Sequence, residues 1–190
     1  PMAQAADLEQ AELMVAEKRY SDAAELLGSS AQAYPGAVLS ARALIRKAEL
    51  EERVISPEQA VETYLKLKSA ELEPDAAATL SIRRAICLIH LSREAEALVV
   101  LKELVSSDRT PPAMVSLARF QMALALERQG KFGDALAAYL DFVDKSGVAA
   151  EPDPELQQLI KTARWKAEKL QWLRGLGTTV SHTDVRTEKL

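Results

Sequence analysis

Apolar positions recur along this chain with helical spacing, and they do so in pairs of segments. One set of four segments is centred on alanines, and in each a large apolar residue follows four positions later, on the same face of a helix. The four alanines are Ala23, Ala60, Ala97 and Ala135. Their separations of 37, 37 and 38 residues predict an internal repeat.

A second apolar helix precedes each of these segments and carries its own alanine 12 residues upstream. These alanines are Ala11, Ala48, Ala85 and Ala123. Three residues after them the chain is apolar in three repeats, whereas the second repeat has Glu51. Alanine lets two helix backbones approach closely, and a larger neighbour fills the space above it. Each repeat is therefore predicted to be a hairpin of two antiparallel helices.

Turn-forming residues separate the predicted hairpins. Ser56, Pro57 and Gln59 are typical of an N-cap, a first helical residue and the partner of a capping box. Proline and glycine fall where second helices should stop, around 35–36, 73–75, 110–112 and 144–147. We predict one helical domain over residues 4–174, with residues 175–190 as a flexible tail. Within it we predict repeats at about 4–35, 41–74, 78–110 and 114–147, and a capping helix at 154–174.

The segment Leu117–Tyr139 resembles a tetratricopeptide repeat. A small residue, a large residue, the turn glycine Gly130, the aromatic Phe132, an Ala-Leu pair and Tyr139 fall at that family's spacing. The other three repeats lack the turn glycine, and each unit is longer than that family's period of about 34 residues. The resemblance covers about residues 4–147. It implies an all-α, right-handed solenoid of antiparallel helical hairpins, which serves as a scaffold.

Composition agrees with a helical chain. Ala occurs 32 times and Leu 27 times in 190 residues, against 7 Gly, 8 Pro and 9 aromatic residues. Such a balance argues against a β-sandwich or a β-barrel. With 24 basic and 28 acidic residues the net charge is −4, so the chain lacks the positive field that attracts nucleic acid. We expect no nucleic-acid partner.

Candidates for catalysis are few. His90 and His182 lie 92 residues apart, and Cys87 sits in an apolar run that predicts a small buried residue rather than a reactive thiol. The glycines of 175–177 follow a helix, so we interpret them as a helix end rather than a phosphate-binding loop. We therefore predict no catalytic, cofactor or metal site, and an enzyme is the remote alternative.

Two surfaces are predicted to bind a partner. In tetratricopeptide proteins the first helices of the hairpins line a concave groove that holds a peptide or a helix, and the resemblance implies the same here. An apolar groove rimmed by arginines suits an amphipathic or acidic segment. The alternative is that the apolar members belong to the core, covered by the chain's own last helix. The residues are Arg42, Ile45, Arg46, Ile82, Arg83, Ile86, Phe120 and Leu124.

The second surface lies on the last helix. At about 100° per residue its aliphatic side chains form one stripe, and Trp165 and Trp172 fall on the opposite side with Lys161 and Lys169. The segment 155–174 has a net charge of +3, from five basic and two acidic residues. Exposed tryptophan with lysine is typical of an interface with a protein partner, with a second copy in a homodimer, or with a membrane surface. The alternative is a helix buried on both sides.

The sequence as a whole predicts a non-catalytic protein–protein interaction module, an adaptor or chaperone-like scaffold for a partner peptide or helix. No stretch approaches the roughly 18 apolar residues of a membrane span, and no signal peptide is visible. A cytoplasmic location is the default expectation. The alternative is a periplasmic or envelope-facing assembly factor whose N-terminal membrane anchor has been removed. The alanine-rich, degenerate repeats look bacterial.

Overall fold

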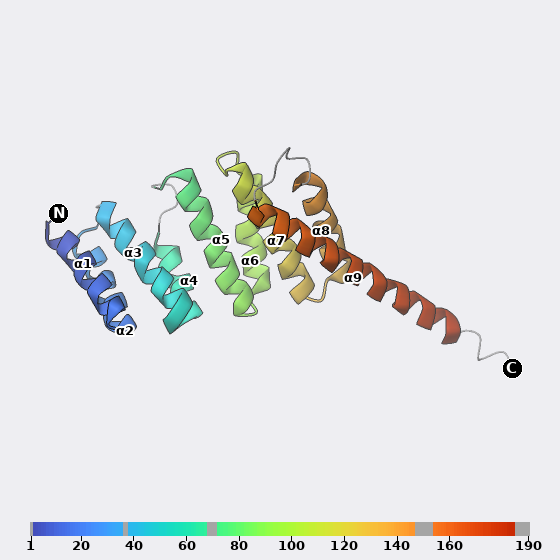
Figure 1. Ribbon diagram of the computed structural model, residues 1–190, viewed down its shortest axis with the longest axis horizontal. Coiled ribbons are helices and arrows are strands. Elements are labelled where there is room, and N and C mark those ends of the chain that lie inside the picture. Colours follow the sequence, from blue (N-terminus) through green and yellow to red (C-terminus); the bar gives the residue numbers. More distant parts are fainter. Residues whose placement is uncertain (1, 36–37, 68–71, 147–153, 185–190) are drawn as a thin grey trace.

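The molecule is an elongated row of helices with its two ends far apart (Figure 1). The computed structural model describes residues 2–35, 38–67, 72–146 and 154–184, without the side chains of 38 and 176–184. Within these ranges the chain forms nine α-helices and one π-helix, and no strand. The predicted all-α class is confirmed for the described residues.

The helices follow one another as hairpins. The first hairpin is α1 (Met2–Ala16) with α2 (Tyr20–Ala33), and the second is α3 (Val38–Leu50), the π-helix η1 (Glu51–Ile55) and α4 (Pro57–Lys66). The third is α5 (Pro74–His90) with α6 (Glu94–Ser106), the fourth is α7 (Pro112–Arg128) with α8 (Phe132–Ser146), and α9 (Pro154–Asp184) comes last. Each helix packs mainly on its neighbours in chain order, and α1 also touches α3 as α5 touches α7.

The aligned alanines mark the places where helices meet. All eight are at most 1% exposed. The large residues four positions after the second set, Leu27, Tyr64, Leu101 and Tyr139, are buried as well. Small residues permit close approach and large ones fill the remaining volume, so the repeating pattern of the sequence is the pattern of the core.

The buried apolar residues form three clusters along the row. The first includes Ala11, Leu27 and Leu50 and joins α1, α2 and α3. The second spans α3 to α7, and the third, around Phe142, joins α7, α8 and α9. Because each cluster involves only neighbouring helices, we expect stability to be partly local.

Three hairpin turns share one backbone conformation. Lys18, Ser92 and Gly130 have φ values of 64°, 58° and 74°. Each lies seven residues after an aligned alanine, and the next residue donates its N–H to a carbonyl five residues earlier, as in a Schellman motif. Only one of the three is glycine, although left-handed φ costs another residue roughly 1 kcal/mol. In the first and third hairpins the missing turn glycine therefore changes the residue type and leaves the turn intact.

The second hairpin has the π-helix in place of this turn. The N–H of Ser56 donates to the carbonyl of Glu51, and the Ser56 hydroxyl accepts from the N–H of Gln59 at 3.4 Å. The N-cap is confirmed, whereas the backbone N–H of Ser56 is taken by Glu51, which replaces the reciprocal bond of the predicted capping box. Pro57 occupies the first helical position, as predicted.

The π-helix places a carboxylate in the core. Glu51 is only 2% exposed, and its register position is apolar in the other three repeats. One of its oxygens lies 3.0 Å from Nζ of Lys47, and the other accepts a hydrogen bond from Oγ1 of Thr63 at 2.5 Å. The ion pair with Lys47 and the hydrogen bond from Thr63 stabilise this buried charge, because a buried carboxylate without partners is strongly destabilising.

Several predicted boundaries shift. Pro74 and Pro112 open α5 and α7 as first helical residues, although we interpreted both as stops after the preceding helix. The last helix continues to Asp184, ten residues past the predicted end at 174, so the tail predicted from 175 is helical as far as it is described. A glycine costs a helix about 1 kcal/mol but keeps its backbone hydrogen bond, so Gly175 does not end it. Residues 36, 147 and 185–190 of the predicted turns and tail lie outside the described residues.

Candidate functional site

The last helix packs on α8 through one face only. Ile160, Ala163, Ala167 and Leu170 are buried in the cluster around Phe142, and Leu156 and Leu159 pack partly buried against it. This burial agrees with the aliphatic stripe predicted from the sequence. The contacts of α9 are chiefly with α8 and a few with α7, at one end of the row (Figure 1).

A polar cluster of Glu127, Tyr139 and Lys166, called here the polar joint, attaches the same helix to the fourth hairpin. One oxygen of Glu127 accepts hydrogen bonds from Nζ of Lys166 and from the hydroxyl of Tyr139, both at 2.7 Å. The Lys166 ammonium also lies 5.8 Å from the centroid of the Tyr139 ring. Burial alone would raise the pKa of Glu127, but the bonds from Lys166 and Tyr139 outweigh it, so the pKa lies below its usual range.

We expect this joint to give α9 a pH-dependent attachment. A lowered pKa in the folded state means stability that is present above the unfolded value of about 4.3 and is lost as the pH falls through the folded value. Glu127→Gln keeps an acceptor for Tyr139 but removes the ion pair, and should cost about 0.5–1 kcal/mol at neutral pH for this partly exposed pair. Urea unfolding of both proteins across pH 7 to 3 measures it. The difference should shrink below about pH 4.5; a difference independent of pH would contradict this account.

The outer face of α9 carries both tryptophans of the chain. Trp165 is 59% exposed and Trp172 is 65% exposed. They are two helical turns apart, about 10 Å along the axis. Nζ of Lys169 lies 5.5 Å from the centroid of the Trp165 ring, and Lys161 and Glu168 are exposed beside the indoles. We call this surface, formed by Lys161, Trp165, Glu168, Lys169 and Trp172, the tryptophan ridge.

The residues predicted for the concave groove separate into two groups. Ile82 and Phe120 are buried in the core, and Ile45, Ile86 and Leu124 are half-buried. The last helix packs at the far end of the row and does not lie along α1 and α3 (Figure 1). The predicted apolar floor is therefore partly core: Ile82 is buried among α3 to α7, whereas Phe120 is buried in the cluster that includes side chains of α9.

The arginines predicted at the rim are engaged in ion pairs between neighbouring hairpins. Arg46 holds Glu12 with two bonds of 2.7 and 2.8 Å, and Arg83 holds Glu49 at 2.7 Å. Arg46 also reaches Glu49 at 3.3 Å, and Arg83 reaches Glu52 at 3.3 Å. Alternating charges thus tie α1, α3 and α5 together, and sequence reasoning missed the carboxylate partners. Their signal was present, because Glu12 and Glu49 both follow an aligned alanine directly.

A shallow hollow remains between α1 and α3. It has a volume of about 380 Å³ and is lined by Leu8, Glu9, Arg42 and Ile45 together with the charged pairs beside them. Arg42 is exposed and has no side-chain partner among the described residues. This hollow is the part of the predicted groove that the structure keeps open.

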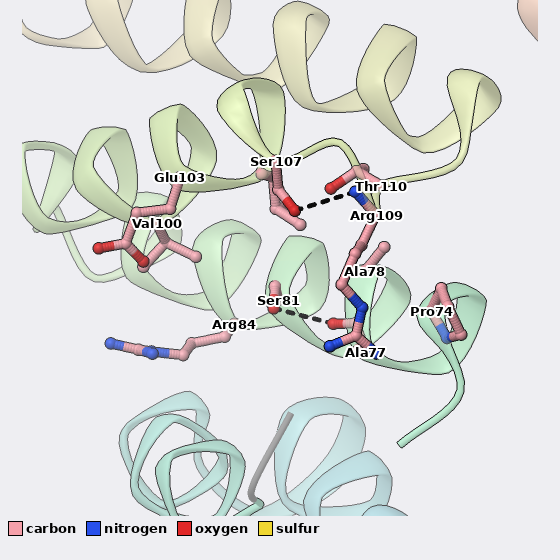
Figure 2. Close-up of a pocket in the computed structure, with 11 residues that line it drawn as sticks. Pro74, Ala77, Ala78, Ser81, Arg84, Val100, Glu103, Ser107, Arg109 and Thr110 are labelled. Carbon is pink, nitrogen blue, oxygen red and sulfur yellow. Dashed lines mark hydrogen bonds between the residues drawn. The ribbon is translucent and has the colours of Figure 1, made fainter. Parts of the chain in front are cut away.

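A second hollow of about 360 Å³ lies between α5 and α6 (Figure 2). Ala77, Ala78 and Ser81 line it from α5. Arg109 reaches toward this floor, whereas the Arg84 side chain runs away from it (Figure 2). The two guanidinium groups therefore diverge, and the arrangement does not converge on one anion. Sequence reasoning missed this hollow, since it depends on how neighbouring helices are spaced.

The remaining candidates for chemistry are separate from these surfaces. Cys87 is buried, and burial raises the pKa of its thiol to about 11, as expected for a structural residue. His90 is exposed at the end of α5, and the side chain of His182 lies outside the described residues. In the described part of the chain no group of three His, Cys, Asp or Glu residues could hold a metal ion.

Comparison with known proteins adds no family. No protein-family model matches the chain, and no curated protein matches it. Among the described helices none is both long and apolar enough to span a membrane.

Proposed function

We propose that the chain is a non-catalytic protein-interaction module that binds a partner through the tryptophan ridge of α9. The observation that carries this proposal is the exposure of both tryptophans, Trp165 and Trp172, on one side of a helix whose other side packs on α8 and α7. Large exposed aromatic side chains are rare on free surfaces and are enriched at the centres of interfaces.

A protein suits this ridge better than a lipid surface. Helices that lie in a membrane interface separate an apolar face from a charged face. Here Lys161, Glu168 and Lys169 alternate with the indoles on the same ridge, so insertion would carry charges, one of them negative, into the lipid boundary. A protein partner can meet each charge with an opposite one while it covers the rings.

We also infer a tetratricopeptide-like solenoid as the scaffold that presents the ridge. Two kinds of contact that recur at fixed spacings support this arrangement. The ion pairs Arg46–Glu12 and Arg83–Glu49 both join residues 34 positions apart. Tyr64 and Tyr139 each donate to a glutamate 12 positions earlier, so the second and fourth hairpins share this bond. In such arrays the surfaces bind partners and the core carries no chemistry.

The hollow between α1 and α3 is a second candidate binding surface. Leu8 and Ile45 supply apolar surface there, and the guanidinium of Arg42 has no side-chain partner among the described residues. These features suit one apolar side chain and one carboxylate of a bound segment.

Site-specific photo-cross-linking in the producing cells tests the ridge. A photoreactive residue at Glu168, between the two indoles, should form a discrete adduct with a protein, because the partner covers this position. The matched control is the same residue at Glu62, an exposed glutamate on α4. Adducts from Glu168 that disappear in a Trp165→Ala, Trp172→Ala background support the proposal. The absence of an adduct at Glu168, or equal adduct yields at Glu168 and Glu62, would contradict the proposal.

A further inference from the structure

We propose that the tryptophan ridge binds the outer face of α1 from a second copy of this chain, so that molecules associate head to tail. This inference rests on the proposed function of the ridge and names its partner. The two surfaces lie at opposite ends of the row of helices (Figure 1). One molecule therefore cannot join its own two ends, and the contact is made between copies.

The outer face of α1 has an exposed apolar centre. Leu13 lies opposite the buried Ala11 on the helix, and its side chain is 66% exposed. Met2 is exposed on the same side, three turns earlier. The end helices of a repeat array ordinarily present a polar outer face. Here both end helices, α1 and α9, expose large apolar side chains, and neither face is covered within the described chain.

The charges of the two ends are opposite. The first hairpin, residues 2–33, has six acidic and two basic side chains, a net charge of −4, against +3 for residues 155–174. Glu9 lies one turn before Leu13, where the outer face borders the hollow between α1 and α3, and has no side-chain partner among the described residues. On the ridge, Lys161 is likewise exposed and free of a described side-chain partner. Docking α1 on the ridge brings these charges together around an apolar centre.

A symmetric contact between two ridges would bring together two surfaces of the same net positive charge. The segment 155–174 carries +3 in each copy, and like charges at an interface are costly. The head-to-tail contact uses two different surfaces instead, so it can repeat from copy to copy. Its length is that of α1, 15 residues or about 22 Å.

The contact is small, so the association should be weak. A single helix pair lies at the low end of interface sizes, below about 1,200 Å², which fits dissociation constants of about 10–100 µM. Sedimentation velocity of the whole chain between about 5 and 500 µM covers this range. We expect the weight-average sedimentation coefficient to rise with concentration. Raising NaCl from 50 to 500 mM should weaken association roughly tenfold, since salt screens the opposed charges.

Two variants make the test decisive. The double variant Trp165→Ala, Trp172→Ala removes the indoles of the ridge. The double variant Glu9→Lys, Leu13→Lys reverses the charge of the α1 face and removes its apolar centre. All four positions are exposed, so both proteins should fold, and circular dichroism checks this. Each variant alone should stay monomeric. Each keeps one intact face, so an equimolar mixture should form dimers that do not grow further. The control Val99→Lys alters an equally exposed apolar residue on α6 and should associate like the wild type.

The opposing outcomes are distinct. Wild-type protein that stays monomeric throughout overturns this inference, as does an α1 variant that associates normally or a Val99→Lys variant that does not associate. A monomeric wild type whose Glu168 position cross-links to a different protein overturns only the second-copy partner and leaves the ridge as a binding surface. A monomeric wild type with no adduct at Glu168 overturns both proposals.

Discussion

Replacing Lys47 by methionine is expected to lower the free energy of unfolding by about 2–3 kcal/mol. The substitution removes the cation 3.0 Å from the carboxylate of Glu51, which is almost completely buried. Thr63 continues to donate one hydrogen bond, but the negative charge is left without compensation in an apolar surrounding. The expected loss is smaller than the about 3–5 kcal/mol of fully buried pairs because the Lys47 side chain is 21% exposed. Urea unfolding followed by circular dichroism measures the change.

The matched control is Glu51→Leu, alone and combined with Lys47→Met. Leucine is similar in size to glutamate, and Leu88 and Leu126 occupy the same register position in two other repeats. We expect the double variant to recover stability to within about 1 kcal/mol of the wild type, because no buried charge remains. A double variant as unstable as Lys47→Met would show that the lysine acts through packing rather than charge.

The repeating alanines explain how much of the fold is readable from the sequence. Close helix contacts require a small residue at one register position, so Ala11 to Ala135 predict all four hairpins and their order. The turns at Lys18 and Ser92 were not predictable from residue type, because the backbone hydrogen bonds of the Schellman motif close there around a φ that neither residue favours. The π-helix was not predictable either, since Glu51 stays in the core through Lys47 and Thr63, which come from two different helices.

The tryptophan ridge and the arginine rim of the groove also differ in how far the sequence alone predicts them. The tryptophan ridge follows from helical geometry alone, because a stripe of Ile160, Ala163 and Leu170 leaves Trp165 only the opposite side. The arginine rim depends on which carboxylates approach from the preceding hairpin. Arg46 finds Glu12 there, a contact between positions far apart in sequence. One helix fixes the first surface, whereas the second depends on how separate helices pack.

The ridge also depends on the core beneath it, and Phe142→Ala should reveal this. Phe142 is fully buried, with its ring centroid 5.6 Å from that of Phe120, at the centre of the cluster that attaches α9 to α8. Deleting the ring leaves a cavity among side chains held by three helices, and we expect a loss of about 3–5 kcal/mol in unfolding free energy. Phe132→Ala is the matched control on the same helix: Phe132 is 56% exposed, so its loss should be below about 1 kcal/mol.

Amide hydrogen exchange shows which helices are destabilised by Phe142→Ala and by Lys47→Met. Because the three core clusters join only neighbouring helices, Phe142→Ala should speed amide exchange in α7, α8 and α9 and leave α1 and α2 nearly unchanged. Lys47→Met should speed amide exchange around α2, α3 and α4 and leave α8 and α9 nearly unchanged. The combined variant should lose the sum of the two effects within about 0.5 kcal/mol, since the sites share no partners. Equal acceleration along the whole chain in either variant would mean one cooperative core, in which the ridge could not loosen while the first hairpin stays folded.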